Sequence, residues 1–328
     1  MKKLIFISFL FVTIQTTLYA QSKGLSEEGY KHWVRAVSMM KDAQKDIDYL
    51  KTAFEFINVL KYDSTYADVY YNLGILYTKL GDFGGGVRPY DIAKRYYNKY
   101  LELRPSEKNA LAKELIQLDL KKEKFLENIG LNMIPIEKGI YLEKGKPIEV
   151  DAFYIQNHVF TVADFKRLIT PIAVSMASVR TGKNFSIPIQ ESPTGNDNVP
   201  YISSYITAEQ IVEVLNYVTG KHFFIPKQAH WERIAFILSN GKYKPSEKQL
   251  NSLGIYVGGV YPTANRPSIY EWVNLSKGEK KLAFQWFPFT GKCTIGMYFL
   301  YWPYRDVYNV TNDITEAMTF RLALSIEK

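Results

Sequence analysis

The side chains best suited to chemistry in this 328-residue chain are one cysteine and four histidines. Cys293 is the only thiol, which excludes an internal disulfide and any multi-thiolate metal site within one chain. The histidines, His32, His158, His222 and His230, are scattered, and the last two lie eight residues apart rather than at helical ligand spacing. No G-x-S-x-G, phosphate-loop or H-E-x-x-H motif is present. We therefore predict no metal and no cofactor, and structural or solvated roles for the histidines.

A second group with binding chemistry is a run of aromatic residues towards the C-terminus of a chain that is 15% aromatic. One interpretation is that these rings form core strands and the rim around them. The other is an exposed groove that stacks on sugars or captures a peptide, because aromatic side chains supply large, rigid contact areas. The candidate ligand or partner surface consists of Trp286, Tyr298, Tyr301 and Trp302, among neighbouring rings at Phe284, Phe287, Phe289, Phe299 and Tyr304.

The composition is that of an ordinary globular protein, with 47% hydrophobic and 23% charged residues. Lys and Arg number 41 and Asp and Glu 33, which gives a net charge of +8, but no dense basic run occurs. We therefore predict no nucleic-acid partner. The length favours about two domains.

Residues 1–20 have the pattern of a secretory signal peptide. Lys2 and Lys3 form the positive region, Leu4–Ile14 is largely apolar, and Ala20 is the small residue before a cleavage site. The apolar run is short for a bilayer of about 30 Å, so a retained transmembrane helix is the weaker alternative. No cysteine near the cut could carry a lipid. We predict an exported protein, periplasmic or outer-membrane associated, that is not a lipoprotein and has no transmembrane segment after cleavage.

Residues 67–105 carry the spacing of one tetratricopeptide repeat. They follow W-x2-L-G-x2-Y, with Tyr in place of Trp, and then an A-x3-F pattern that leads to a proline. Large residues at i, i+3 and i+7 would face the partner helix, and the glycine would let the two backbones approach closely. The repeat residues are Tyr70, Leu73, Gly74, Tyr77, Ala93, Tyr97 and Pro105.

The repeat departs from the usual period by an insertion of about seven residues, Phe83–Tyr90, whose Gly84–Gly86 run is interpreted as a flexible turn. Gly81 is predicted to end the first helix. One period upstream, Phe56 and Val59 fit the second helix of a degenerate repeat. The alternative to repeats is a plain antiparallel helix bundle. Two repeats fall short of the three usually needed for a continuous core.

Beyond residue 130 the pattern changes to short β-rich runs, turns and a few helices. Six blocks carry a family resemblance: Met133–Tyr141, Phe153–Leu168, Pro200–Ala208, Phe224–Glu232, Ser268–Val273 and Thr319–Ala323. In this order they resemble the sulfatase-modifying-factor family, the fold of the formylglycine-generating enzyme, which is similar to C-type lectins. The fold class expected is therefore multidomain: a signal peptide over 1–20, an all-α tetratricopeptide-like region over 21–125, and an α+β C-type-lectin-like domain over 131–328.

Local patterns support helices inside these blocks. Thr207 with Gln210 forms a predicted capping box, and Gly220 is predicted to stop the same helix. Thr161 with Asp164 opens a shorter helix in a related way.

Four further residues of the blocks are candidates for the interior. Trp231 and Trp272 are expected core anchors, since buried indoles contribute large apolar areas. Arg321 and Glu271 would need polar partners if they are buried.

The resemblance also implies a chemistry that this chain lacks the ligands for. The family enzyme holds Cu(I) with two cysteine thiolates, whereas this sequence has only Cys293. We therefore predict a pseudoenzyme. The first functional hypothesis is a non-catalytic scaffold or assembly protein of the cell envelope that binds protein partners, since the family includes non-enzymatic members of secretion and gliding-motility machinery. The alternatives are a glycan- or peptide-binding module and an enzyme of unrecognised chemistry.

Overall fold

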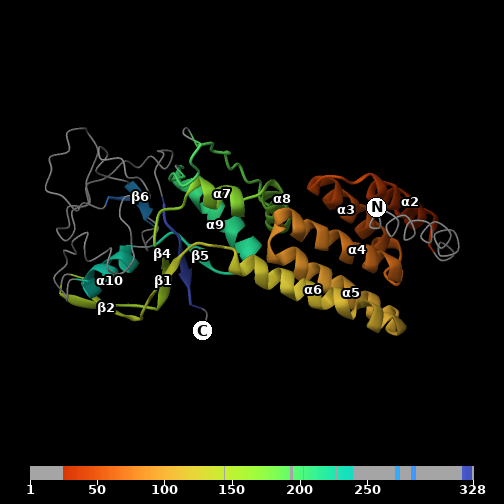
Figure 1. Ribbon diagram of the computed structural model, residues 1–328, viewed down its shortest axis with the longest axis horizontal. Coiled ribbons are helices and arrows are strands. Elements are labelled where there is room, and N and C mark those ends of the chain that lie inside the picture. Colours follow the sequence, from red (N-terminus) through yellow and green to blue (C-terminus); the bar gives the residue numbers. More distant parts are fainter. Residues whose placement is uncertain are drawn as a thin grey trace. The chain divides into compact units, whose positions relative to one another are not determined.

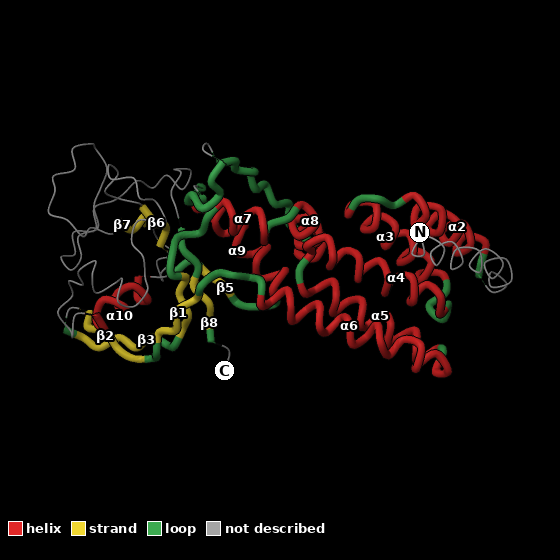
Figure 2. The backbone as a smooth tube through the Cα atoms, in the orientation of Figure 1, coloured by secondary structure: helices red, strands yellow, loops and turns green. Residues whose placement is uncertain are grey.

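The computed structural model divides the chain into two compact units, between Phe125 and Leu126. Among the residues that the structure describes, the first unit is built of helices and the strands all lie in the second unit (Figure 2). The described residues thus have a mostly helical N-terminal region followed by a region with a small sheet, which is compatible with the expected fold class. The residues described are 25–143, 145–192, 195–201, 203–226, 228–238, 270–273, 282–285 and 320–326.

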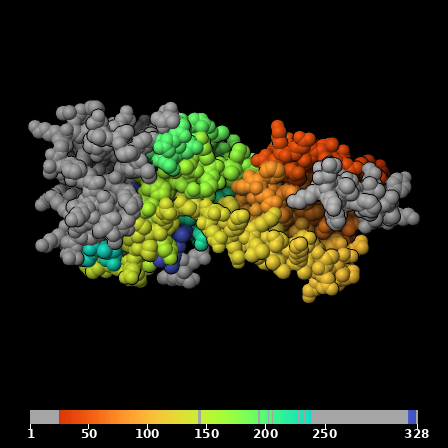
Figure 3. Space-filling model, viewed as in Figure 1, coloured from red at the N-terminus to blue at the C-terminus, as the bar shows by residue number. Residues whose placement is uncertain are grey.

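The first unit is a series of helices in which each of the first three contacts the next along the chain. A π-helical turn, Gly81–Gly85, and a 3-10 turn, Pro105–Glu107, lie between the later helices. In Figure 3 the colour of this unit changes from red to yellow in chain order, because helices that are consecutive in the sequence pack against one another. The helices are α2 (Glu27–Asp42), α3 (Asp46–Tyr62), α4 (Ala67–Leu80), α5 (Val87–Leu103) and α6 (Lys108–Glu127).

The core of the helical unit lies within and between the helix pairs α2–α3 and α4–α5. Phe56 and Val59 on α3 and Leu73 on α4 are fully buried. Trp33 of α2 meets Phe56 edge-on, with ring centroids 5.5 Å apart. An edge-to-face pair of this kind adds to the stabilisation from area burial alone.

Gly74 is the position where α4 and α5 need a residue without a side chain. A Cβ placed there would lie 2.4 Å from a ring carbon of Tyr97 on α5. That separation is far inside van der Waals contact, so any larger residue would force the helices apart. The close approach inferred from the repeat spacing is confirmed at this position.

The proposed insertion after α4 is smaller than expected. The α-helix ends at Leu80, and the segment Gly81–Gly85 continues it as a π-helical turn. Helix α5 begins at Val87, so the last four residues assigned to the insertion belong to the second helix of the pair. Gly84 and Gly86 have φ values of 90° and 86°, a region that glycine enters without strain.

The described residues of the second unit form one four-stranded antiparallel sheet and two separate two-stranded antiparallel pairs. Its sheet order is β1 (Met133–Ile136), β4 (Phe153–Gln156), β8 (Ala323–Ser325) and β5 (Phe223–Phe224). The two-stranded pairs join β2 (Gly139–Glu143) to β3 (Lys146–Val150), and β6 (Tyr270–Val273) to β7 (Leu282–Gln285). The helices are α7 (Val162–Leu168), α8 (Pro171–Thr181), α9 (Tyr205–Thr219) and α10 (Gln228–Leu238), as labelled in Figure 1.

Strand pairing in this sheet brings together blocks that are far apart in the sequence. Ala323 of β8 pairs with Ile155 of β4 on one side and with Phe224 of β5 on the other. The first block, expected to be a single opening strand over Met133–Tyr141, is instead divided into β1 and β2. Trp231 packs in the same core with no exposed surface, which confirms it as a core anchor.

The helix caps of the second unit are partly as predicted. The reciprocal Thr161–Asp164 capping box is present at α7, and Gly220 ends α9 with φ 68°. The predicted Thr207–Gln210 box is wrong, because α9 begins earlier, at Tyr205. Its cap is Ser204, whose Oγ accepts a hydrogen bond from Thr207 N at 3.1 Å.

Among the residues that the structure describes, no helix is both long and apolar enough to span a bilayer. The expected signal peptide, residues 1–20, lies outside the described residues.

Candidate functional site

Most repeat residues pack between helices rather than facing outward. Tyr70, Leu73 and Tyr77 of α4 are buried, as are Ala93 and Tyr97 of α5. The hydroxyl of Tyr70 donates to Ser64 O at 2.8 Å, which ties the helix to the preceding turn. Pro105 begins the 3-10 turn after α5. These residues shape the helix pair, and the side chains available to a partner are their neighbours.

One such neighbour is Tyr71, which the repeat spacing does not identify. Its side chain is 38% exposed and lies beside Tyr97 and Tyr100 of α5, with ring centroids 5.9 and 5.3 Å apart. We call the three residues Tyr71, Tyr97 and Tyr100 the tyrosine face. The only sequence signal for Tyr71 was its place directly after a buried repeat residue, since adjacent helical positions point in different directions.

The electrostatic surroundings keep the phenols of this face neutral. Burial raises the pKa of Tyr71, and the charges of Glu114 and Glu107 raise it further. Burial likewise raises the pKa of Tyr100, with Glu107 and Asp68 acting in the same direction. The rings are therefore hydrogen-bonding, uncharged contacts at neutral pH, suited to stacking and not to nucleophilic chemistry.

The four aromatic residues expected to form a ligand or partner surface lie outside the described residues, and so does Cys293. The expected aromatic surface, formed by Trp286, Tyr298, Tyr301 and Trp302, therefore stays a prediction.

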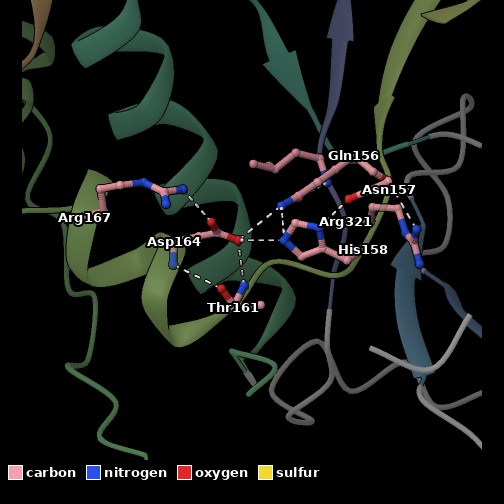
Figure 4. A network of polar contacts seen from close by, with 8 residues as sticks. Gln156, Asn157, His158, Thr161, Asp164, Arg167 and Arg321 are labelled. Carbon is pink, nitrogen blue, oxygen red and sulfur yellow. Dashed lines mark hydrogen bonds and ion pairs between the residues drawn. The ribbon is translucent and has the colours of Figure 1, made fainter. Parts of the chain in front are cut away.

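The second unit holds a buried polar network where β4 leads into α7 (Figure 4). Its centre is Asp164, whose side chain is 4% exposed. Asp164 Oδ2 accepts hydrogen bonds from Thr161 N at 3.1 Å and from Gln156 Nε2 at 3.2 Å. Asp164 Oδ1 accepts from Arg167 Nη2 at 2.6 Å. The carboxylate thus caps α7 and also joins the helix to the strand before it.

His158 occupies the loop between that strand and the helix. Its Nε2 lies 3.4 Å from Asp164 Oδ2, and its Nδ1 is within hydrogen-bonding distance of Asn157 Oδ1. Figure 4 shows Asp164 with Arg167 on one side and the His158 ring on the other. The sequence interpretation of His158 as a structural residue did not foresee this pairing, because the two residues are six positions apart and outside any helical repeat.

The network continues to the C-terminal segment through Gln156, which is fully buried. Leu322 N donates to Gln156 Oε1 at 3.4 Å, and Arg321 Nη1 donates to Gln156 O at 3.1 Å. Arg321 is itself fully buried, with its guanidinium carbon 5.5 Å from the centroid of the Trp231 ring. Arg321, for which we inferred a need for polar partners, thus donates to a backbone carbonyl and lies over an aromatic ring.

The charge balance of the network favours an ionised Asp164. Burial alone raises the pKa of this carboxyl, but the hydrogen bonds from His158 and Thr161 N and the charges of His158 and Arg167 outweigh it. The pKa of Asp164 is therefore below its ordinary value. The ionised carboxylate also helps to orient the His158 ring beside it.

Within the described ranges, no group of three or more His, Cys, Asp or Glu side chains could hold a metal ion. No protein-family model, curated protein or solved structure matches this chain. The resemblance to the sulfatase-modifying-factor family therefore stays a prediction from the sequence.

Proposed function

We propose that this protein is a non-catalytic scaffold or assembly protein of the cell envelope, of the kind found in secretion or gliding-motility machinery. It is exported through the N-terminal signal and binds a protein partner with its helical unit. The observation that carries the proposal is the tyrosine face on α4 and α5.

The tyrosine face has the character of a protein-binding surface. Tyr71 is held by two neighbouring rings and yet keeps more than a third of its surface accessible. A ring that is already ordered loses little conformational freedom on binding, and tyrosine is enriched among residues that dominate interface energies. A partner that covers Tyr71 would gain apolar contact and a hydroxyl to hydrogen-bond.

The finer architecture belongs to the same proposal. The α2–α3 and α4–α5 pairs would be two tetratricopeptide-like repeats, with α6 as the capping helix, a view supported by the Gly74–Tyr97 contact. The second unit would be a degenerate sulfatase-modifying-factor domain of C-type-lectin-like fold. Support for this comes from the closing block, which pairs with an early strand of the same sheet.

The proposed lack of Cu(I)-dependent catalysis rests on the number of cysteine thiols. A Cu(I) bis-thiolate site needs two sulfur ligands, and the sequence supplies only Cys293. The test is oxidation of a sulfatase-type cysteine peptide by the Cu(I)-loaded mature protein and by Cys293→Ala. We expect no turnover by either protein, and turnover that disappears in the variant would contradict this part of the proposal.

The partner surface is tested by photo-crosslinking in the native cell. A photoreactive residue placed at Tyr71 of the full chain should give a discrete crosslinked product, whose partner is then identified by mass spectrometry. The same residue at Lys99, an exposed position of α5, serves as the control. We expect Lys99 to give little or none of that product.

The identified partner then provides a second measurement. Tyr71→Ala should lower its recovery with the protein, whereas Tyr30→Ala, which removes an equally exposed tyrosine from α2, should leave recovery unchanged. Equal crosslinking at both positions, or unchanged recovery with Tyr71→Ala, would contradict the proposed surface.

A further inference from the structure

The tyrosine face is an aromatic surface that its own neighbours leave partly open. The Tyr71 ring is inclined by 58° to the ring of Tyr97 and by 48° to that of Tyr100, so neither ring lies parallel to it. Tyr71 itself keeps 38% of its surface exposed. The face of a tyrosine ring attracts a lysine or arginine side chain that lies within about 6 Å of its centre. The tyrosine face is therefore suited to a cation.

The contacts between α5 and α6 bring an acidic side chain level with this face. Two ion pairs join the helices, Asp91–Lys122 and Lys94–Asp119. A step of three residues forward on α5 is thus a step of three residues back on α6, so the two helices run in opposite directions. Continued along both helices, the same spacing places Glu114 of α6 level with the segment of α5 from Tyr97 to Tyr100.

Two carboxylates act on the rings of the tyrosine face. Burial, Glu114 and Glu107 are the causes that raise the pKa of Tyr71, and no described cation opposes them. Glu107 also raises the pKa of Tyr100. Both glutamates are exposed, and neither forms an ion pair with a residue that the structure describes. Each can therefore accept a cation from outside the chain.

A nearby cation, Arg104, is matched by a third carboxylate. Its charge lowers the pKa of Asp68 on α4 and that of Tyr100. Arg104 and Asp68 offset each other, which leaves Glu107 and Glu114 to set the sign of the charge beside the rings. The whole chain carries a net charge of +8, so this acidic position differs from the average of the molecule. A basic segment is attracted here and repelled by the chain as a whole.

We propose that the tyrosine face binds a basic segment of the protein partner, with a lysine or arginine side chain over the rings and its charge beside Glu107 and Glu114. The rings supply cation–π attraction, and the carboxylates supply the opposite charge. Exposed rings alone would accept a neutral apolar or sugar surface as well, whereas the two carboxylates select a cation. The inference rests on the proposed function, because it specifies the partner that this surface binds.

The direct test uses a defined probe with the purified full chain. A fluorescent peptide of arginine, glycine and serine is compared with the same peptide carrying citrulline in place of arginine, a change that removes the charge and keeps the shape. At low ionic strength the arginine peptide should bind at least about threefold more tightly. The preference should nearly vanish at about 1 M salt. Equal binding of the two peptides would overturn the inference.

Matched variants then locate the binding. The double variant Glu107→Gln with Glu114→Gln should weaken binding of the arginine peptide about three- to tenfold. Tyr71→Ala should weaken it about two- to fivefold, and Tyr71→Phe, which keeps the ring, should bind like the wild type. Glu102→Gln is the control, because this exposed glutamate of α5 is already paired with Lys99 at 2.6 Å. Binding that is unchanged in the double variant, or equally weakened by Glu102→Gln, would overturn the inference.

The partner identified by crosslinking at Tyr71 separates this inference from the proposed function. Its recovery should fall with Tyr71→Ala and also with the Glu107→Gln and Glu114→Gln double variant. A fall with Tyr71→Ala alone would overturn the basic segment and leave the proposed surface standing. Unchanged recovery with Tyr71→Ala would contradict the proposed surface, and this inference with it.

Discussion

Each of the two units is stabilised internally by a different kind of contact. In the helical unit, aromatic rings lie against glycines: Tyr97 against Gly74, and Tyr90 against Gly81, where an added Cβ would come within 2.4 Å of the ring. The ion pairs that link its later helices are at least one-third exposed at every partner. In the second unit, by contrast, a fully buried glutamine and the nearly buried Asp164 connect a strand, a helix and the C-terminal segment.

This difference predicts how each unit responds to its surroundings. Aromatic packing is insensitive to pH and salt, and exposed ion pairs contribute little. A buried carboxylate with several donors is costly to disturb, because breaking one contact leaves charge or polar groups without partners. We therefore expect the second unit to be the pH-dependent part of the molecule. Hydrogen exchange resolved by segment can follow the two units separately.

The largest expected effect is the loss of an apolar anchor from the second unit. Trp231→Ala removes a side chain with no exposed surface and should lower the free energy of unfolding of that unit by about 3–5 kcal/mol. Trp231→Phe is the matched variant, since it keeps an aromatic face beneath Arg321 and should lose less. Chemical denaturation followed by segment-resolved exchange would measure both, and an equal loss in the helical unit would contradict the separation of the two cores.

The next largest effect should come from the centre of the buried network. Asp164→Asn removes the charge that Arg167 and His158 contact, and we expect a loss of about 3 kcal/mol in the second unit. Asp197→Asn is the control, because it neutralises a more exposed carboxylate in an ion pair with Lys166 and should cost much less. Similar losses in the two variants would show that the buried network does not dominate.

The lowered pKa of Asp164 also predicts the direction in which stability changes at acid pH. The pKa of Asp164 is lowered in the folded protein, so its ionised form stabilises the fold above the ordinary aspartate value of about 3.9. This contribution is lost as the pH falls through the folded value. The acid unfolding of the second unit should therefore be steeper in the wild type than in Asp164→Asn, as measured by circular dichroism against pH.

Local features of both units could be predicted from the sequence, whereas contacts over long separations could not. The Gly74 contact and the Thr161–Asp164 cap each follow from spacings of a few residues. At α9 the sequence pattern favoured Thr207, whereas Ser204, three residues earlier, forms the cap. The Gln156–Leu322 contact joins residues 166 positions apart, and no local pattern indicates such a pairing.

A smaller effect is expected where the helical unit depends on close approach. Gly74→Ala places a methyl group where the Tyr97 ring lies, and should cost about 1–3 kcal/mol through overpacking. The double variant Gly74→Ala with Tyr97→Leu replaces the flat ring with a more compliant side chain and should recover part of the loss. If Gly74→Ala proves neutral or stabilising, helix propensity outweighs the steric contact, and the aromatic-on-glycine description of this unit is wrong.

The smallest effect should come from three ion pairs that link α6 to α5 and to the turn Gly81–Gly85. They are Lys94–Asp119, Lys121–Asp82 and Lys122–Asp91, with nitrogen–oxygen distances of 2.7, 2.7 and 2.8 Å. Each partner remains partly in water, so attraction is weakened by the high dielectric and offset by the entropy of ordering a long side chain. A double-mutant cycle with Lys94→Gln and Asp119→Asn should give a coupling of about 0.2–1 kcal/mol.

At about 1 M salt, where the screening length is about 3 Å, the coupling should nearly vanish, whereas the loss caused by Asp164→Asn should persist because that carboxylate is buried. A salt-resistant coupling above about 2 kcal/mol at Lys94–Asp119 would mean that the helical unit, too, depends on electrostatics that solvent does not screen.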